Sequence, residues 1–136
     1  MKSADSFNGL PCQVSGVRSV QRVLVVDDDP DGAEGVAELL SVWGFQTKFA
    51  LDGPTGIALA KVFLPQLILL DVGLPEMDGY EVARQLRREA SLSTVKLIAV
   101  SGWSGPEREL KAREAGFDHY IVKPIQLSAL TPILGG

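Results

Sequence analysis

Five polar residues of this chain stand at the ends of short apolar runs. They are Asp27, Asp28, Asp71, Ser101 and Lys123. Three carboxylates brought together repel one another and resist full ionisation, so a cation is needed to offset their charge. An all-oxygen acidic cluster suits Mg²⁺, which keeps several waters and binds through one or two carboxylates together with phosphate oxygens.

The other two residue types point to phosphate. The ammonium of Lys123 is a compact charge on a flexible stem, well suited to a phosphoryl oxygen. Ser101 adds a hydroxyl donor, and Gly102 allows its backbone N–H to approach a ligand closely. With one carboxylate as nucleophile, the set predicts a phosphoryl-transfer site with an aspartyl-phosphate intermediate. The alternative for Asp71 alone is a solvated loop aspartate.

These residues act together only if the fold brings them together. The run at residues 67–70 is continuously apolar and is followed closely by Gly73 and Pro75, a pattern typical of a parallel strand covered on both faces. Similar patterns predict strands at residues 23–26, 46–49, 67–70, 96–100 and 119–122. In open α/β sheets ligands bind outside the carboxyl ends of the strands, where the five polar residues would lie.

Helical spacing of apolar residues separates the strands. It predicts helices at residues 33–43, at 54–64, from Tyr80 onward, at 106–115 and at 127–134. The second helix opens at Asp52 and would bury Ile57, Ala60 and Leu64. Three arginines of the third helix lie mostly off its apolar stripe and predict a solvated face: Arg84, Arg87 and Arg88. Alternating strands and helices with right-handed crossovers predict one doubly wound, five-stranded parallel α/β sheet.

Composition narrows the class of protein. The chain has 136 residues, 46% of them hydrophobic, and a net charge of −4. This predicts one domain at residues 21–134 after a tail or linker at residues 1–20, and it argues against binding nucleic acid or an acidic membrane surface. The single Cys12 excludes an internal disulfide framework. No apolar run reaches the roughly 20 residues of a membrane helix, and the N-terminus lacks a signal peptide's apolar core, so we expect a cytoplasmic protein.

Three rival motifs are weighed against this interpretation. The residues Asp27, Asp29, Asp31, Gly32 and Glu38 satisfy the EF-hand calcium-loop pattern. That loop needs a preceding helix, whereas residues 23–26 predict a strand, and Pro30 and Glu34 fit it badly. Haloacid-dehalogenase phosphatases need Thr or Val where Asp31 stands. A flavodoxin would carry a Ser/Thr/Gly phosphate loop after the first strand, which this sequence lacks.

Together the motifs resemble the receiver domain of two-component response regulators, from Arg22 to about Leu134. They are Val25-Val26-Asp27-Asp28, Leu70-Asp71-Val72-Gly73-Leu74-Pro75-x-Met77-Asp78-Gly79, Val100-Ser101-Gly102 and Val122-Lys123-Pro124. The resemblance implies a flavodoxin-like fold with strand order 2-1-3-4-5, the order known from chemotaxis receivers. It also implies a bacterial signalling domain that is not a separate enzyme, although it assists its own phosphorylation and dephosphorylation.

The same resemblance assigns roles to residues. Asp71 would accept phosphate from a phosphohistidine of a histidine kinase or a histidine phosphotransfer protein. The Mg²⁺ ligands would be Asp28, Asp71 and the carbonyl of Gly73, with Asp27 assisting mostly through water. Lys123 would pair with Asp71 and then with its phosphate, and a cis bond is implied between Lys123 and Pro124. The implied switch residues are Ser101, which would bond the phosphoryl group with Gly102 beside it, and Tyr120.

Several alternatives stay open. Tyr120 would also suit an edge strand without a signalling role, since aromatic residues favour strands. Trp103 is an exposed loop aromatic, a lid over the phosphate or a partner contact; His119 is read as a surface residue, and Glu76 and Asp78 as turn and helix-cap residues.

The domain acts alone on a downstream protein, is fused to an output domain, or comes from a hybrid sensor histidine kinase, an origin favoured by the irregular N-terminal stretch and the Gly135-Gly136 end. A degenerate receiver acting only as a binding module is the contrasting class.

Overall fold

A computed structural model describes residues 21–74 and 77–134 as one α/β domain built on a five-stranded parallel sheet. The strand order is β2-β1-β3-β4-β5, which confirms the predicted order. The strands are β1 (Arg22–Val26), β2 (Gln46–Ala50), β3 (Leu67–Asp71), β4 (Lys96–Ser101) and β5 (His119–Val122). The tail predicted at residues 1–20, with Cys12, and the turn residues Pro75 and Glu76 lie outside the described residues.

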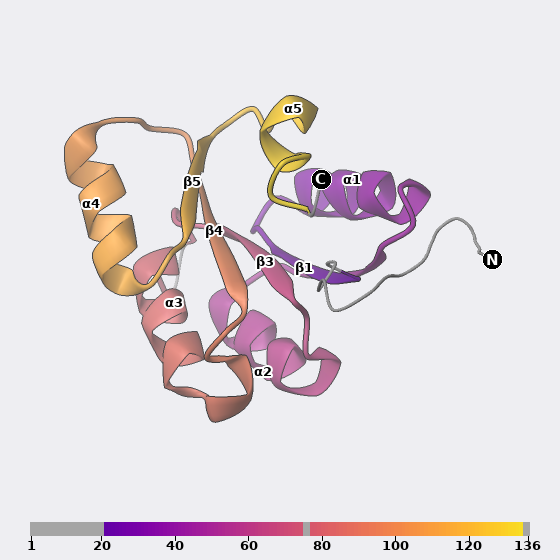
Figure 1. Ribbon diagram of the computed structural model, residues 1–136, viewed down its shortest axis with the longest axis horizontal. Coiled ribbons are helices and arrows are strands. Elements are labelled where there is room, and N and C mark those ends of the chain that lie inside the picture. Colours follow the sequence, from indigo (N-terminus) through magenta and orange to yellow (C-terminus); the bar gives the residue numbers. More distant parts are fainter. Residues whose placement is uncertain (1–20, 75–76, 135–136) are drawn as a thin grey trace.

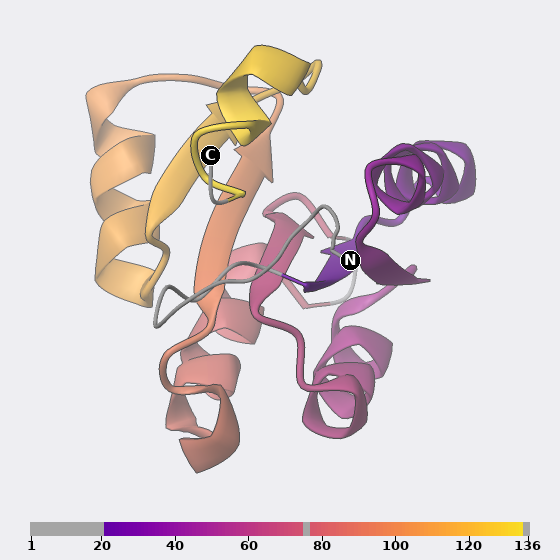
Figure 2. The ribbon, with the colours of Figure 1, turned by 45° about the vertical axis from the view of Figure 1, so that its right-hand side comes forward.

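Helices cover both faces of the sheet (Figures 1 and 2). They are α1 (Pro30–Val42), α2 (Gly53–Phe63), α3 (Gly79–Arg88), the 3-10 turn η1 (Ala90–Leu92), α4 (Pro106–Ala115) and α5 (Leu127–Leu130). α1 and α5 lie on one side of the sheet, while α2, α3 and α4 lie on the other. Within the described ranges, none of these helices has the length and apolar character to cross a bilayer.

The strands feed two separate cores because successive side chains of a strand point to opposite faces. In β3, Leu67 and Leu69 pack with α1 and the C-terminal segment, whereas Ile68 and Leu70 pack with α2, α3 and α4. All four leucine and isoleucine side chains are buried, as the continuous apolar run predicts for a central strand. The two cores therefore fix β3, and with it Asp71 at its end, from both faces.

Local sequence sets the helix starts as predicted. Asp52 accepts a hydrogen bond from the Thr55 amide at 2.7 Å and caps α2. Asp78 accepts one from the Glu81 amide at 2.8 Å and caps α3, confirming its predicted capping role. Each contact satisfies one of the amide groups that a helix leaves unpaired in its first turn.

The C-terminal helix is shorter than predicted. We expected it to span residues 127–134, whereas α5 ends at Leu130 and residues 131–134 form turns. Pro132 explains the difference, since proline lacks an N–H donor and disfavours helical backbone at the residue before it. The 3-10 turn η1 is also absent from the prediction.

Two predictions about side-chain burial are wrong. Leu64 does not belong to the buried face of α2: it is 41% exposed and forms the C-cap, with a left-handed φ of 52°. Arg87 does not lie on a solvated face of α3, because its guanidinium is turned inward and hydrogen-bonded. Apolar spacing alone contains neither the end of a helix nor the contacts of a long cationic side chain.

We predict that Leu64→Gly raises the free energy of unfolding by about 1 kcal/mol, since glycine adopts the left-handed conformation without the clash that Cβ causes in leucine. Leu64→Ala keeps a Cβ and serves as the matched control, with no gain expected. Urea unfolding of the three proteins measures the effect. A glycine variant no more stable than the alanine variant would show that φ at this position stores no strain.

Candidate functional site

Asp71 is the last residue of β3 and the most enclosed acid of the site. Its side chain is buried, with 7% of the residue exposed. Oδ1 accepts a hydrogen bond from the Gly73 amide at 2.8 Å, and Oδ2 accepts one from the Lys123 ammonium at 2.9 Å. Each carboxylate oxygen therefore has a hydrogen-bond donor, so burial leaves neither oxygen without a partner.

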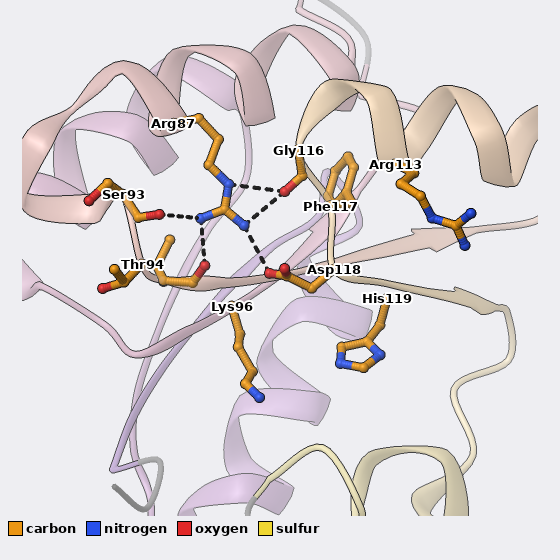
Figure 3. Close-up of a pocket in the computed structure, with 10 residues that line it drawn as sticks. Arg87, Ser93, Thr94, Lys96, Arg113, Gly116, Phe117, Asp118 and His119 are labelled. Carbon is orange, nitrogen blue, oxygen red and sulfur yellow. Dashed lines mark hydrogen bonds and ion pairs between the residues drawn. The ribbon is translucent and has the colours of Figure 1, made fainter.

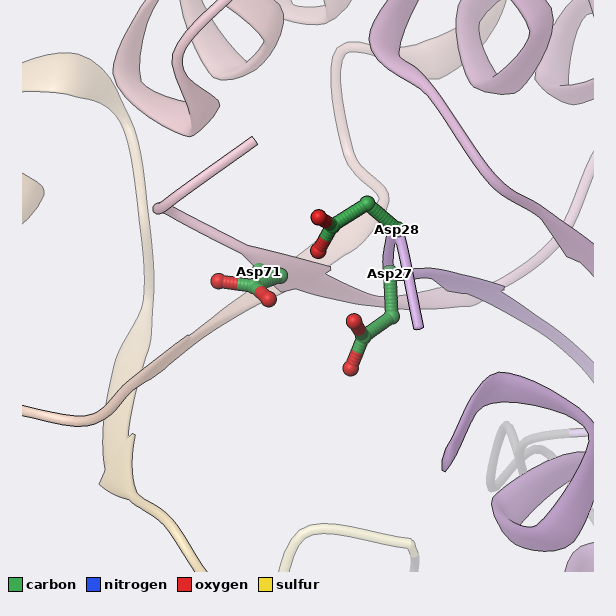
Figure 4. Close-up of side chains that lie close together, drawn as sticks. All are labelled: Asp27, Asp28 and Asp71. Carbon is green, nitrogen blue, oxygen red and sulfur yellow. The ribbon is translucent and has the colours of Figure 1, made fainter. Parts of the chain in front are cut away.

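Asp27 and Asp28 bring two more carboxylates to Asp71. One oxygen from each of the three lies within 4.8 Å of the others, and Figure 4 shows them gathered beyond the ends of β1 and β3. Lys123 also lies 3.4 Å from Asp27 Oδ2, so one ammonium faces carboxylates from both strands. The sheet thus brings Asp27, Asp28, Asp71 and Lys123 together from three separate strand ends, as predicted.

In this cluster, burial and neighbouring charges have opposing effects on the pKa values of Asp27 and Lys123. Burial is the largest influence on Asp27 and raises the pKa of its carboxyl, with Asp71 adding to the rise against the Asp29 amide and Lys123. Burial by itself would lower the pKa of Lys123, but the hydrogen bond and charge of Asp71, together with Asp27, raise it overall. Lys123 is therefore held as a cation. Without a metal ion to balance the acids, protonation of Asp27 is easier than that of a free aspartate.

Ser101 and Tyr120 are linked through the backbone of one residue, Trp103. Ser101 ends β4, is 1% exposed, and its Oγ accepts a hydrogen bond from the Trp103 amide at 3.1 Å. The Tyr120 hydroxyl donates to the Trp103 carbonyl at 2.7 Å. Arg108 lies over the Trp103 ring at 5.4 Å from its centre, and Trp103 is 65% exposed. The loop after β4 therefore ties both predicted switch residues to an exposed aromatic residue.

Gly79, at the start of α3, packs tightly against Val72, the residue that follows β3. The Gly79 amide donates to the Val72 carbonyl at 3.2 Å, and a Cβ on Gly79 would lie 2.4 Å from Val72 Cα. No side chain fits there, which explains sterically why position 79 is a glycine. On the far side of the site the Lys123–Pro124 bond is cis, confirming that prediction.

The structure also tests a rival motif and the remaining predicted residues. β1 precedes Asp27 directly, so the EF-hand pattern lacks the helix it requires. His119 is exposed at the start of β5, consistent with a surface residue. Gly102 follows Ser101 in an exposed position. The bridging role of Trp103 was missed, because backbone contacts leave no signal in residue type.

The fold and the acid–lysine cluster define a class: doubly wound α/β domains with an acidic site at the carboxyl edge of the sheet. The family model described as the response regulator receiver domain matches residues 23–134. This chain belongs to that family, the phosphoacceptor signalling domains of two-component systems. Such a domain is a signalling module rather than an enzyme in itself.

Individual relatives differ in length. The chain is 38% identical to the DNA-binding response regulator MtrA of Mycolicibacterium smegmatis over 78% of this chain and 45% of MtrA. It is 29% identical to Protein PilH of Pseudomonas aeruginosa, covering 85% of this chain and 98% of PilH. The chain spans less than half the length of several curated relatives that it matches.

One similar solved structure is the receiver domain of a Pseudomonas aeruginosa sensor histidine kinase. It is 27% identical, with a TM-score of 0.75 over 84% of this chain and 93% of that chain. That structure carries a magnesium ion coordinated in its active-site cleft.

We predict that metal-free protein loses stability as pH rises from about 4 toward neutrality, in part through Asp27. Its native pKa lies above the unfolded value, so the native state binds more protons over this range and stability falls with rising pH. Asp27→Asn should flatten this slope. Urea unfolding across the pH range in EDTA measures it, and equal slopes for both proteins would contradict the assigned shift.

Proposed function

We propose that Asp71 accepts a phosphoryl group from a phosphohistidine of a partner protein. The observation that supports this most is the 2.9 Å contact between Lys123 Nζ and Asp71 Oδ2 inside a cluster of three carboxylates. A merely structural ion pair would not need two further acids beside it. Family membership supplies the reaction, and the geometry favours Asp71 as the nucleophile.

In the proposed reaction a carboxylate oxygen of Asp71 attacks phosphorus, and the P–N bond to the donor imidazole breaks. The imidazole nitrogen leaves with the bonding electrons and takes a proton from solvent. Lys123 would move from the carboxylate to the phosphoryl oxygens, whose charge it can bind. The Gly73 amide already donates to Asp71 Oδ1 and so helps to orient the Asp71 carboxylate for attack. Hydrolysis of the resulting acyl phosphate would return the domain to its starting state.

The residues present fit a magnesium ion. Three carboxylates whose oxygens lie within 4.8 Å of one another supply hard oxygen ligands, and their combined negative charge exceeds the positive charge of one lysine. Asp28, Asp71 and the carbonyl of Gly73 would hold the ion, with Asp27 acting mostly through water. The ion would neutralise charge on the phosphoryl oxygens. The magnesium bound by the sensor-kinase receiver supports this assignment.

Ser101 and Tyr120 would convert phosphorylation into a change of surface. A phosphoryl group adds nearly two negative charges and strong acceptors. Ser101 would reach it by donating its hydroxyl hydrogen to a phosphoryl oxygen beside Gly102, while its oxygen still accepts the Trp103 amide and so draws the loop with it. Because Tyr120 bonds to the carbonyl of the same tryptophan, the loop and the face formed by α4, β5 and α5 would shift together.

The partners follow from this chemistry. The donor would be a histidine kinase or a histidine phosphotransfer protein, and the setting cytoplasmic. The recipient would be a downstream protein or a fused output domain, since relatives include both longer regulators and a protein of matching length. An origin in a hybrid sensor kinase remains an alternative, and the complete set of acids with Lys123 argues against a degenerate binding module.

We predict that the protein incubated with a small phosphodonor and Mg²⁺ gains one phosphoryl group, and that Asp71→Asn gains none. Intact-mass spectrometry measures the adduct. Glu114→Gln, which changes an exposed acid of α4, is the control and should resemble wild type. Equal uptake by wild type and Asp71→Asn would overturn the assignment of Asp71.

We predict that Mg²⁺ binds the folded state and so raises the melting temperature. At a concentration of 100 times its Kd, it would add about 2.7 kcal/mol to the free energy of unfolding. Asp28→Asn should be more stable than wild type without metal, because it deletes one repelling charge, and should gain less from Mg²⁺. Melting curves in EDTA, Mg²⁺ and Ca²⁺ compare the two proteins. A metal-independent melting point would count against the site, and preference for Ca²⁺ would favour the EF-hand interpretation.

We predict that Trp103 fluorescence changes when beryllofluoride, a phosphoryl mimic, binds with Mg²⁺. Ser101→Ala should still bind the mimic but lose most of the response, because the hydroxyl that pulls on the Trp103 amide is gone. Trp103→Phe should be silent, leaving only Trp43 on the distant α1 side. An unchanged signal in Ser101→Ala would show that this hydroxyl does not couple the site to the loop.

A further inference from the structure

Arg87, near the end of α3, uses every N–H donor of its guanidinium (Figure 3). Nε and Nη2 donate to the Gly116 carbonyl at 3.0 and 2.8 Å. Nη1 donates to the carbonyls of Ser93 and Val95 at 3.1 and 2.6 Å. Nη2 also donates to Asp118 Oδ2 at 2.8 Å. The side chain is 23% exposed. A planar fork saturated in this way fixes its acceptors relative to one another.

The acceptors belong to two chain segments. Ser93 and Val95 lead into β4, whereas Gly116 and Asp118 connect α4 to β5. Asp118 Oδ2 also accepts the Leu97 amide at 2.9 Å, which adds a direct bond between the segments. The guanidinium lies at the C-terminal end of α4, where the helix carries partial negative charge, so a cation there is favourable.

The two ends of α4 are held very differently. At the C-terminal end Ala112 and Ala115 are buried, and Phe117 is buried just beyond. The Phe117 amide closes the helix by donating to the Ala112 carbonyl at 3.0 Å. At the N-terminal end residues 106–111 are all exposed, and Gly105 provides no side-chain cap. Its side chains Arg108 and Lys111 lie over the rings of Trp103 and Tyr80, at 5.4 and 4.6 Å from the ring centres. This exposed end, called the free end below, follows directly from the loop that carries Trp103.

We infer that Arg87 is a positioning residue of the switch, which fixes the C-terminal end of α4 so that phosphorylation moves only its N-terminal end. A stiff helix held at one end converts a pull on the other into rotation about the fixed end. Ser101 and Trp103 would pull at the free end, while Arg87 keeps the turn before β5 in place. The inference about movement rests on the proposed function, whereas the fixed end is a property of the unphosphorylated protein.

The test compares amide hydrogen exchange in wild type, Arg87→Lys and Arg84→Lys. Arg87→Lys keeps the positive charge but loses the fork that reaches Gly116, Ser93 and Val95 together. Arg84→Lys is the matched control, because Arg84 lies on the same helix, is exposed, and pairs with Glu81 of that helix. Exchange is resolved by NMR with and without beryllofluoride and Mg²⁺, below the melting temperature of every variant.

Without the mimic, wild type should exchange faster at the non-proline residues of 102–111, which are mostly exposed, than at residues 116–118, whose amides are hydrogen-bonded beside buried side chains. Arg87→Lys should exchange about 10-fold faster at residues 116–118, as loss of about one net hydrogen bond predicts. The amides of β3 and those of Arg84→Lys should be unchanged. No acceleration at residues 116–118, or the same acceleration in β3, would overturn the anchor, since the second result indicates only global destabilisation.

With the mimic, wild type should change at residues 102–111 and not at residues 113–119, whereas Arg87→Lys should change in both ranges. A wild-type change that already includes residues 113–119, or the same pattern in Arg87→Lys, would overturn the positioning role. Failure of the mimic to perturb the Gly73 amide in wild type would instead count against the proposed function. The mimic-free comparison would then still decide whether Arg87 is the anchor.

Discussion

The Lys123 ammonium lies between Asp71 and Asp27, 2.9 and 3.4 Å from their carboxylate oxygens, and this contact makes the acidic cluster compatible with a folded sheet edge. Three carboxylates within 4.8 Å repel one another, and two of them are largely buried. One cation offsets only part of that charge. The unbalanced remainder would favour the binding of a metal ion. The pKa of Asp27 is raised by burial first and by the neighbouring charge of Asp71 in addition.

The rest of the fold maintains this arrangement. Asp71 ends β3 and Asp27 follows β1, two adjacent central strands that are each fixed by a core on both faces. β4 and β5 deliver Ser101 and Lys123 to the same edge, where Lys123 meets the acids. The strands thus hold the charges in place, while the loop after β4 carries the exposed Trp103 and is joined to Ser101 and Tyr120 by single hydrogen bonds. Such a combination suits a domain whose charge changes while its fold is retained.

The sheet and the clustering of the acids with Lys123 were predictable, because apolar runs and the residues at their ends are encoded locally. The strand order was an implication of the resemblance to receiver domains. The end of α5 was predictable in principle from Pro132, which the apolar spacing outweighed in our prediction. The exposed Leu64 and the inward Arg87 were not predictable from spacing, since a backbone conformation and a long side chain's acceptors depend on segments distant in sequence. The same reason hid the Trp103 bridge, which consists of backbone groups.

The central claim is that Asp71, and neither Asp27 nor Asp28, carries the phosphoryl group. Borohydride reduces an acyl phosphate to an alcohol and so converts a phosphorylated aspartate into homoserine. Protein treated with phosphodonor and Mg²⁺, reduced and digested, should therefore show homoserine at position 71 by tandem mass spectrometry. Homoserine at position 27 or 28, with aspartate intact at position 71, would contradict the account.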